Sequence, residues 1–169
     1  NFAKATPVTP TQFVPPESCN EVIEYHKNSG AFGWNSTSAV LQDETNTSVH
    51  IAGVIQGDHR EVVRHVSGLT SGSKYTLSFT ARQTPGSALW LTYAVYSDSL
   101  GTNQYCGAMK KTSDSQDLNV TCEFTASGAD VFLFLTLNNW DDPQVDISNL
   151  KLLAPDGKDL IEASAVAIP

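Results

Sequence analysis

The aromatic side chains in ALWLTYAVYSD, residues 88–98, are spaced as a ligand-binding surface would need them. Successive side chains of a β-strand point to opposite faces, so Trp90 and Tyr96 would share one face and Tyr93 would lie on the other. If the strand's remaining apolar residues pack in a core, Trp90 and Tyr96 line the opposite face, where a groove could offer flat rings to the C–H faces of sugars. The alternative is that Trp90 belongs to the core, because aromatic residues dominate core burial.

Polar groups that can hydrogen-bond sugar hydroxyls occur in two further places. Asn139 and Asp141 flank Trp140 in the loop-like sequence NNWDDP, and an exposed Trp beside an amide and a carboxylate would suit contact with a ligand or a partner. Equally, Trp140 could fold back and plug the loop. Arg82 ends the preceding strand-like stretch, and we expect it on the face equivalent to that of Trp90 on the neighbouring strand.

The residues that commonly perform catalysis form no recognisable set. The histidines show no HExxH pattern and no CxxC pair accompanies them, so a zinc site is not predicted. No G-x-S-x-G sequence marks a nucleophile, and no glycine-rich phosphate loop precedes a helix. Asp141 and Asp142 are adjacent, so on a regular strand they would point oppositely and could not flank a glycosidic bond. We therefore predict that the chain is not an enzyme.

The elements that would position these groups are short β-strands separated by clusters of Gly, Pro, Asn, Asp and Ser. No segment shows sustained helical periodicity. The predicted fold is all-β, a two-sheet antiparallel β-sandwich. The strands are expected at residues 20–26, 38–44, 48–55, 59–66, 75–82, 88–98, 119–126, 130–138 and 145–153.

The strand expected at residues 75–82 has the most regular pattern. In GLTSGSKYTLSFTAR the apolar residues Tyr75, Leu77, Phe79 and Ala81 alternate with polar ones. This alternation predicts one face packed between two sheets and the other exposed to solvent or a groove. Gly72 would supply the turn from which the strand starts.

The charge and the apolar runs of the chain argue against nucleic-acid binding and against a membrane-spanning segment. The chain has 169 residues, enough for one domain with a sizeable core, and a formal net charge of −8. Nucleic-acid binding depends on clustered Lys and Arg, so no nucleic-acid partner is predicted. The longest apolar runs, such as VFLFLTL, are much too short to span a membrane.

Cysteines and glycosylation sequons favour a secreted, extracellular or cell-surface location. A disulfide between Cys106 and Cys122 would close a loop of about 16 residues and stabilise the fold by about 3 kcal/mol in the chain-entropy model. Alternatively, these residues and Cys19 are three buried thiols. Asn-x-Ser/Thr sequons occur at Asn35, Asn46 and Asn119, close to the number expected by chance for this composition.

The two ends of the chain differ from its centre. Residues 1–16 contain four prolines and are expected to form an extended arm, with the sandwich over residues 17–155. Residues 156–169 end in small apolar side chains and predict an extra strand, on the chain's own sheet or donated to a neighbour.

The central motif GLTSGSKYTLSFTAR resembles that of the galactose-binding-domain-like, jelly-roll carbohydrate-binding modules attached to cellulases and xylanases. Weaker similarity includes Glu24, Gly30 and Trp34 near the start and the apolar–Asp–apolar sequence around Asp146 near the end. The resemblance spans roughly residues 20–153 and implies a jelly roll without catalysis, often with structural calcium.

The calcium ligands implied by the resemblance are Glu24 and Asp146, from the first and last strands. Calcium takes six to eight oxygens, so backbone carbonyls and water would complete the site. Alternatively, Glu24 is an exposed strand residue and Asp146 caps a turn.

Two functions are consistent with these features. The first is a secreted, non-catalytic module that binds a glycan or polysaccharide. The alternative is a structural subunit of an extracellular fibre or surface array, in which identical subunits exchange terminal strands; head-to-tail donation that does not close would produce a filament.

Overall fold

The computed structural model describes residues 32–36, 39–54, 61–85, 90–138 and 144–162. Within these ranges the chain is almost entirely β-structure. Its ten strands are β1 (Trp34–Ser36), β2 (Ala39–Gln42), β3 (Val49–Val54), β4 (Glu61–Ser67), β5 (Lys74–Gln83), β6 (Trp90–Tyr96), β7 (Gln104–Lys111), β8 (Leu118–Thr125), β9 (Asp130–Asn138) and β10 (Val145–Leu153).

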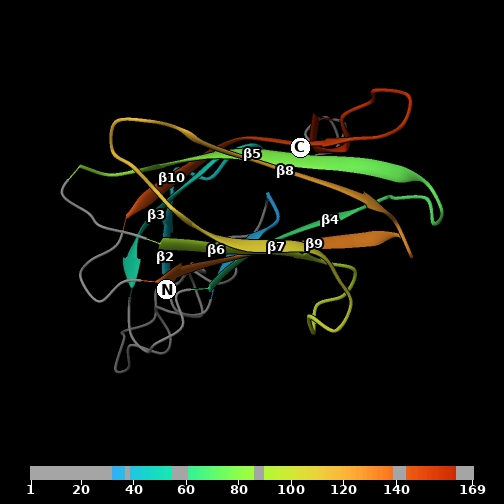
Figure 1. Cartoon of the computed structure of the whole chain (residues 1–169), viewed down its shortest axis with the longest axis horizontal. Coiled ribbons are helices and arrows are strands. Elements are labelled where there is room, and N and C mark those ends of the chain that lie inside the picture. Colours follow the sequence, from blue (N-terminus) through green and yellow to red (C-terminus); the bar gives the residue numbers. More distant parts are fainter. Residues whose placement is uncertain (1–31, 37–38, 55–60, 86–89, 139–143, 163–169) are drawn as a thin grey trace, which may run out of the picture.

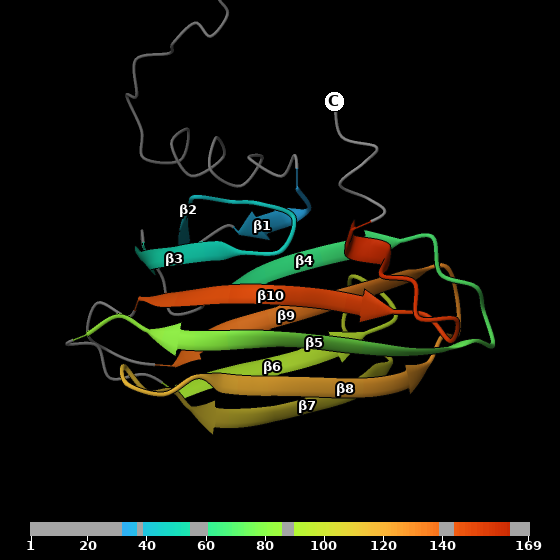
Figure 2. The same cartoon turned by 90° about the horizontal axis from the view of Figure 1, so that it is seen from above.

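The strands form two antiparallel sheets of five, as predicted. Sheet A has the order β1-β4-β9-β6-β7, and sheet B has the order β2-β3-β10-β5-β8. Figure 1 shows the two sheets stacked, and Figure 2 looks through sheet B onto sheet A. Two strands have no clear signal in the sequence: β1, which has three residues, and β7, whose residues are mostly exposed and therefore lack a clear apolar alternation.

The core lies between the sheets, and β5 shows why the chain folds this way. Tyr75, Leu77, Phe79 and Ala81 are buried, which confirms the alternation seen in the sequence. Phe79 meets Tyr93 of sheet A edge-on, with ring centroids 6.1 Å apart. Full burial of one such large side chain stabilises the fold by about 1.5–3 kcal/mol. The inner faces of the two sheets are therefore held together by apolar contact.

The turn before β5 depends on Gly72, as predicted. Its φ of 90° lies in the left-handed region that favours glycine. The turn is closed by a hydrogen bond from the Ser73 amide to the Thr70 carbonyl, and the Gly72 amide donates to the Ala126 carbonyl at the end of β8.

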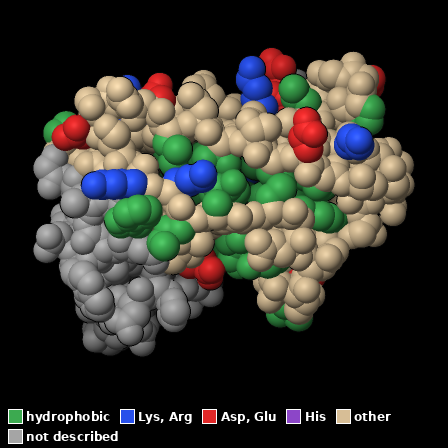
Figure 3. All heavy atoms as spheres, viewed as in Figure 1, with side chains coloured by type: hydrophobic (Ala, Val, Ile, Leu, Met, Phe, Trp, Pro, Cys, Tyr) green, Lys and Arg blue, Asp and Glu red, His purple; other side chains and the backbone are tan. Residues whose placement is uncertain are grey.

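A disulfide joins the sheets at the edge where β7 and β8 lie. Cys106 of β7 is bonded to Cys122 of β8, with their Cα atoms 6.1 Å apart, so the predicted pairing is confirmed. Beside it, Tyr105 stacks on Phe124 with ring centroids 4.4 Å apart. Figure 3 shows hydrophobic side chains along this edge of the molecule.

At the opposite margin, Arg64 of β4 is buried without a carboxylate partner among the described residues. Its guanidinium donates 2.9 Å hydrogen bonds to the backbone carbonyls of His65 and Asn46 and lies over the Trp34 ring. Burial lowers the pKa of Arg64 to about 10. Carbonyl dipoles and an aromatic face thus take the place of a counter-ion.

The strand expected within residues 156–169 stays a prediction, because residues 163–169 lie outside the described part of the chain; the segment that leads to them is not a strand. After β10 the chain turns at Gly157, and residues 160–162 form a helical turn rather than a strand. The Asp159 carboxylate accepts hydrogen bonds from the amides of Leu152 and Ile161, and Ile161 is completely buried in the core. Asp159 caps the helical turn, so the sandwich extends past residue 155 to at least Ile161.

Candidate functional site

The outer surface of sheet A carries the aromatic residues that the sequence singled out. On β6, Leu91, Tyr93 and Val95 face the core. Trp90 and Tyr96 face outward, and Trp90 is 46 % exposed. Trp90 is therefore not a core residue, and we call this outer surface of sheet A the aromatic face.

The strands on either side of β6 extend the aromatic face. Tyr96 lies in register with Phe132 of β9, and Thr92 lies between Thr136 of β9 and Met109 of β7. Because side chains in register share a face, these residues belong to one continuous surface. Met109 is 58 % exposed, so its apolar side chain contributes directly to that surface.

An aromatic cluster occupies one end of this face. The rings of Tyr96 and Phe134 meet edge to face, with centroids 5.1 Å apart. His65 of β4 stacks on Phe132, with centroids 4.3 Å apart and planes 3° from parallel. His65 Nε2 lies 2.8 Å from Asp130 Oδ1, which fixes the orientation of the imidazole ring. The cluster is thus pre-organised by contacts among its own members.

The middle of the aromatic face carries little charge. Thr92 of β6 lies beside Thr136 of β9. One step further along the same face, Phe134 of β9 lies between Ala94 of β6 and Val63 of β4. The described charged residues lie toward the ends of the face, with Glu61 opposite Thr136 on β4, Lys111 opposite Trp90 on β7 and Asp130 beside His65 in the aromatic cluster. This arrangement suits an uncharged ligand with both C–H faces and hydroxyl groups.

The β6–β7 loop borders the aromatic cluster and projects beyond sheet A (Figure 1). Asp98 Oδ1 accepts hydrogen bonds from the amides of Leu100 and Thr102, and Oδ2 accepts a 2.6 Å bond from the Thr102 hydroxyl. These bonds hold the pKa of Asp98 below its usual range. Gly101 lies against the Tyr96 ring, and Leu100 is 84 % exposed. Figure 3 shows this loop as a projection at the border of the face.

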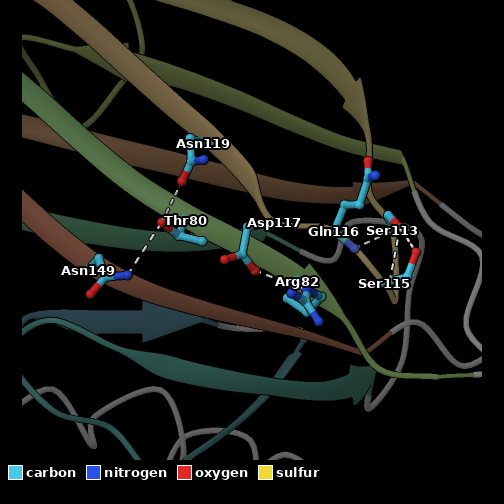
Figure 4. Close-up of polar contacts among 8 residues, drawn as sticks. All are labelled: Thr80, Arg82, Ser113, Ser115, Gln116, Asp117, Asn119 and Asn149. Carbon is cyan, nitrogen blue, oxygen red and sulfur yellow. Dashed lines mark hydrogen bonds and ion pairs between the residues drawn. The ribbon is translucent and has the colours of Figure 1, made fainter.

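The outer surface of sheet B is polar. Arg82 Nε donates a 2.9 Å bond to Asp117 Oδ1, and the Thr80 hydroxyl donates to Asn119 Oδ1 (Figure 4). The prediction that Arg82 lies beside Trp90 is wrong, because β5 and β6 belong to different sheets. Although β5 and β6 are consecutive in the chain, the connection between them crosses from sheet B to sheet A, so they are not sheet neighbours.

Of the two residues expected to bind calcium, Asp146 lies in the described part of the chain. Asp146 lies on the outer surface of sheet B, where its Oδ1 is 2.6 Å from His50 Nδ1. The described residues contain no group of three or more His, Cys, Asp or Glu side chains that could hold a metal. One carboxylate already paired with a histidine falls short of the six to eight oxygens that calcium takes. Glu24 lies outside the described residues, so the calcium site stays a prediction.

Several other predicted residues also fall outside the described part of the chain: Asn139, Trp140, Asp141, Cys19 and the strand at 20–26. The N-terminal arm and residues 163–169, on which the strand-exchange alternative depends, do so as well. Of the sequon residues, Asn119 is exposed, Asn35 is half-buried and Asn46 is buried. In the described ranges, no helix has the length and apolar character needed to cross a bilayer.

Phe132 and Phe134 belong to the aromatic face although they are not among the residues expected there from the sequence. The sequence does contain a signal for them. VFLFLTL has apolar residues on both faces of a strand, whereas a strand with one solvated face should alternate between apolar and polar residues. Val131, Leu133 and Leu135 fill the core, which leaves Phe132 and Phe134 for the outer face.

Comparison with solved structures identifies the architecture. A CBM4 carbohydrate-binding module matches with a TM-score of 0.55 and 12% identity, over 76% of this chain and 90% of that one. The fold is the jelly roll of carbohydrate-binding modules. No family model matches the sequence, and no curated protein matches it either.

Two further modules show the same jelly roll. TmCBM61, solved with β-1,4-galactotriose, has a TM-score of 0.52 and 10% identity over 78% of this chain and 93% of that one. The N-terminal cellulose-binding domain of Cellulomonas fimi β-1,4-glucanase C has a TM-score of 0.51 and 18% identity over 72% of this chain and 88% of that one. At these identities the similarity establishes the jelly roll, and the ligand must be argued from this chain's own residues.

Proposed function

We propose that this protein is a non-catalytic, extracellular carbohydrate-binding module that binds a neutral glycan on the aromatic face of sheet A. The observation that carries the proposal is the 46 % exposure of Trp90 on the same surface as Tyr96. A large exposed aromatic side chain continuous with a further aromatic cluster is typical of a binding surface.

The dimensions of the face suit a chain of several sugar units. Trp90 and Tyr96 are six residues apart on β6, which corresponds to about 20 Å along the strand. Rings near both ends could stack on separate sugar units, and the hydroxyls of Thr92 and Thr136 between them could bond to sugar hydroxyls.

The ligand class follows from the low charge of the face. With Ala94, Phe134 and Val63 at its centre, the middle of the described surface carries no charge, and Lys111 lies at its end beside Trp90, away from that centre. One similar module is named for binding cellulose and another was solved in complex with β-1,4-galactotriose, and both of these saccharides are uncharged and β-linked. We infer that this chain also takes a neutral, β-linked polysaccharide.

The extracellular location is supported by the Cys106–Cys122 disulfide, because disulfides form and persist in oxidising compartments. The absence of catalysis is supported by the chemistry of the face itself. Its acidic neighbours Glu61 and Asp130 lie on different strands, in register with Thr136 and Ser67, at opposite ends of the β4–β9 pairing. They do not form a close carboxylate pair of the kind that cleaves glycosidic bonds.

Isothermal titration with cellulose, xylan, mannan and alginate oligosaccharides tests the proposal. We expect at least one neutral oligosaccharide to bind, alginate not to bind, and Trp90→Ala to weaken binding at least 10-fold. Arg82→Ala is the matched control, since it removes a half-exposed side chain from sheet B and should leave affinity unchanged. No binding by the full chain across a broad glycan array, or equal losses in both variants, would contradict the proposal.

A further inference from the structure

Two of the three sequons, at Asn46 and Asn119, have opposite surroundings in the folded chain. Asn46 is 7 % exposed, its Oδ1 is buried, and its backbone carbonyl accepts a hydrogen bond from Arg64. A sugar on the Asn46 side chain would have to enter this buried region. Asn119, in contrast, is exposed on β8.

The Asn119 amide is oriented by a chain of polar contacts. Asn149 Nδ2 lies 3.5 Å from Thr80 Oγ1, and the Thr80 hydroxyl donates a 2.9 Å bond to Asn119 Oδ1. Because the Asn119 oxygen is the acceptor, its Nδ2 is turned away from Thr80, as Figure 4 shows. A substituent on Nδ2 would leave the bond to Oδ1 intact.

The rest of the sequon lies on the same surface. Asn119 and Thr121 are both exposed, while Val120 between them is buried. The acceptor amide and the hydroxyl of the sequon therefore share the outer face of sheet B. Strand β8 is also the edge strand of this sheet, with β5 as its sheet neighbour.

We infer that Asn119 carries an N-linked glycan that covers the β8 edge of sheet B and leaves the aromatic face of sheet A open. This inference rests on the proposed extracellular location. The donor is an oligosaccharide linked to a lipid pyrophosphate. A C–N bond forms between its anomeric carbon and Asn119 Nδ2, the C–O bond to the pyrophosphate breaks, the amide nitrogen loses one proton, and the lipid pyrophosphate leaves without any redox change.

A glycan at this position has a physical consequence for assembly. An exposed edge strand presents unpaired backbone groups that can pair with another chain. A bulky, hydrated substituent on β8 would hinder such pairing.

The test is secretion of the full chain from a eukaryotic host, followed by enzymatic release of N-glycans in ¹⁸O-water and peptide mapping by mass spectrometry. We expect ¹⁸O-labelled Asp at position 119 in most molecules and unmodified Asn46. Thr121→Val should abolish the label at Asn119, whereas Thr121→Ser, which preserves the sequon, should retain it. Secreted protein with unmodified Asn119, or with a glycan at Asn46, would overturn the inference.

A second measurement tests where the glycan lies. The glycosylated chain and the Thr121→Val variant should bind the same oligosaccharide with affinities within 2-fold of each other, because β8 is in the sheet opposite the aromatic face. A 10-fold or larger difference would overturn this placement. Attachment of the N-linked glycan at Asn119 is measured by mass spectrometry and does not depend on oligosaccharide affinity. An unmodified Asn119 can therefore be distinguished from a failure of the aromatic face to bind an oligosaccharide.

Discussion

The outer faces of the two sheets differ sharply although both belong to strands with equally apolar inner faces. On sheet A, the outward residues of β6 and β9 include Trp90, Tyr96, Phe132 and Phe134. On sheet B, the outward residues of β5 are Thr76, Ser78, Thr80 and Arg82. Thr80 bonds to Asn119 of β8, and Arg82 bonds to Asp117 just before β8. Stability accounts for the inner faces, but it gives no reason for leaving aromatic rings on only one outer face.

The difference indicates how the two faces divide their roles. Polar outer residues such as those of sheet B keep a strand surface hydrated, which is the usual state of an antiparallel sheet with one solvated side. Exposed apolar surface is retained where it contacts a partner or ligand. The aromatic face is therefore the region to perturb for binding, and sheet B provides matched controls.

The largest expected effect comes from a change that damages both sheets at once. Phe79→Ala removes a buried ring that contacts Tyr93 across the core, and we expect it to lower the free energy of unfolding by about 3–5 kcal/mol. Urea denaturation measures this loss. A cost below about 1 kcal/mol would mean that the two inner faces are not packed as described.

The next largest effect concerns the disulfide that joins the adjacent edges of the two sheets. Replacing Cys106 and Cys122 together by Ser should lower the free energy of unfolding by about 3 kcal/mol, since the bond closes a loop with a sequence separation of 16. Denaturation with and without a reductant measures the change. The reductant should destabilise the native chain and leave the double variant unaffected; an unchanged midpoint in both would contradict the role of the bond.

A smaller effect separates the two outer faces. Tyr96→Ala should weaken binding of a neutral oligosaccharide about 10-fold, or about 1.4 kcal/mol, because it removes a ring from the aromatic cluster. Titration calorimetry measures the affinity. Ser78→Ala, on the outer face of β5, is the control and should not alter it. If both changes weaken binding equally, the contrast between the faces has no functional meaning.

The smallest effect is local to the β6–β7 loop. Hydrogen bonds from Thr102 lower the pKa of Asp98 from its ordinary value of 3.8, so the ionised form is favoured in the folded loop. Its contribution is fully present above the unfolded pKa and is lost as pH falls through the lower folded pKa. Asp98→Asn should speed amide exchange at Leu100 and Thr102 at neutral pH, as measured by NMR. Unchanged exchange there, with sheet B amides as the reference, would show that the carboxylate does not hold the loop.

Much of the fold could be predicted from alternation. The inner residues of β5, the turn at Gly72 and the Cys106–Cys122 pair were all read from local sequence and then found in the structure. The helical turn at residues 160–162 could not be predicted, because the apolar pattern around Ile161 suits a strand, whereas capping by Asp159 and burial of Ile161 produce a helical turn. Here tertiary contacts overrode a weak local preference.

The candidate site was predictable only within one strand. Trp90 and Tyr96 are an even number of residues apart on one strand, which placed them on a common face. The local sequence did not indicate that β9 rather than β5 lies beside β6. Arg82 was therefore assigned to the wrong surface, and Phe132 and Phe134 were missed.

The sequence by itself determined which side of a regularly alternating strand such as β5 is buried, because side chains alternate with a period of two and the apolar ones must leave water. Only the tertiary structure decided which outer faces adjoin, because strand order depends on contacts between residues far apart in the chain. That order brought Trp90, Tyr96 and Phe134 onto one surface and placed Arg82 and Asn119 on the other.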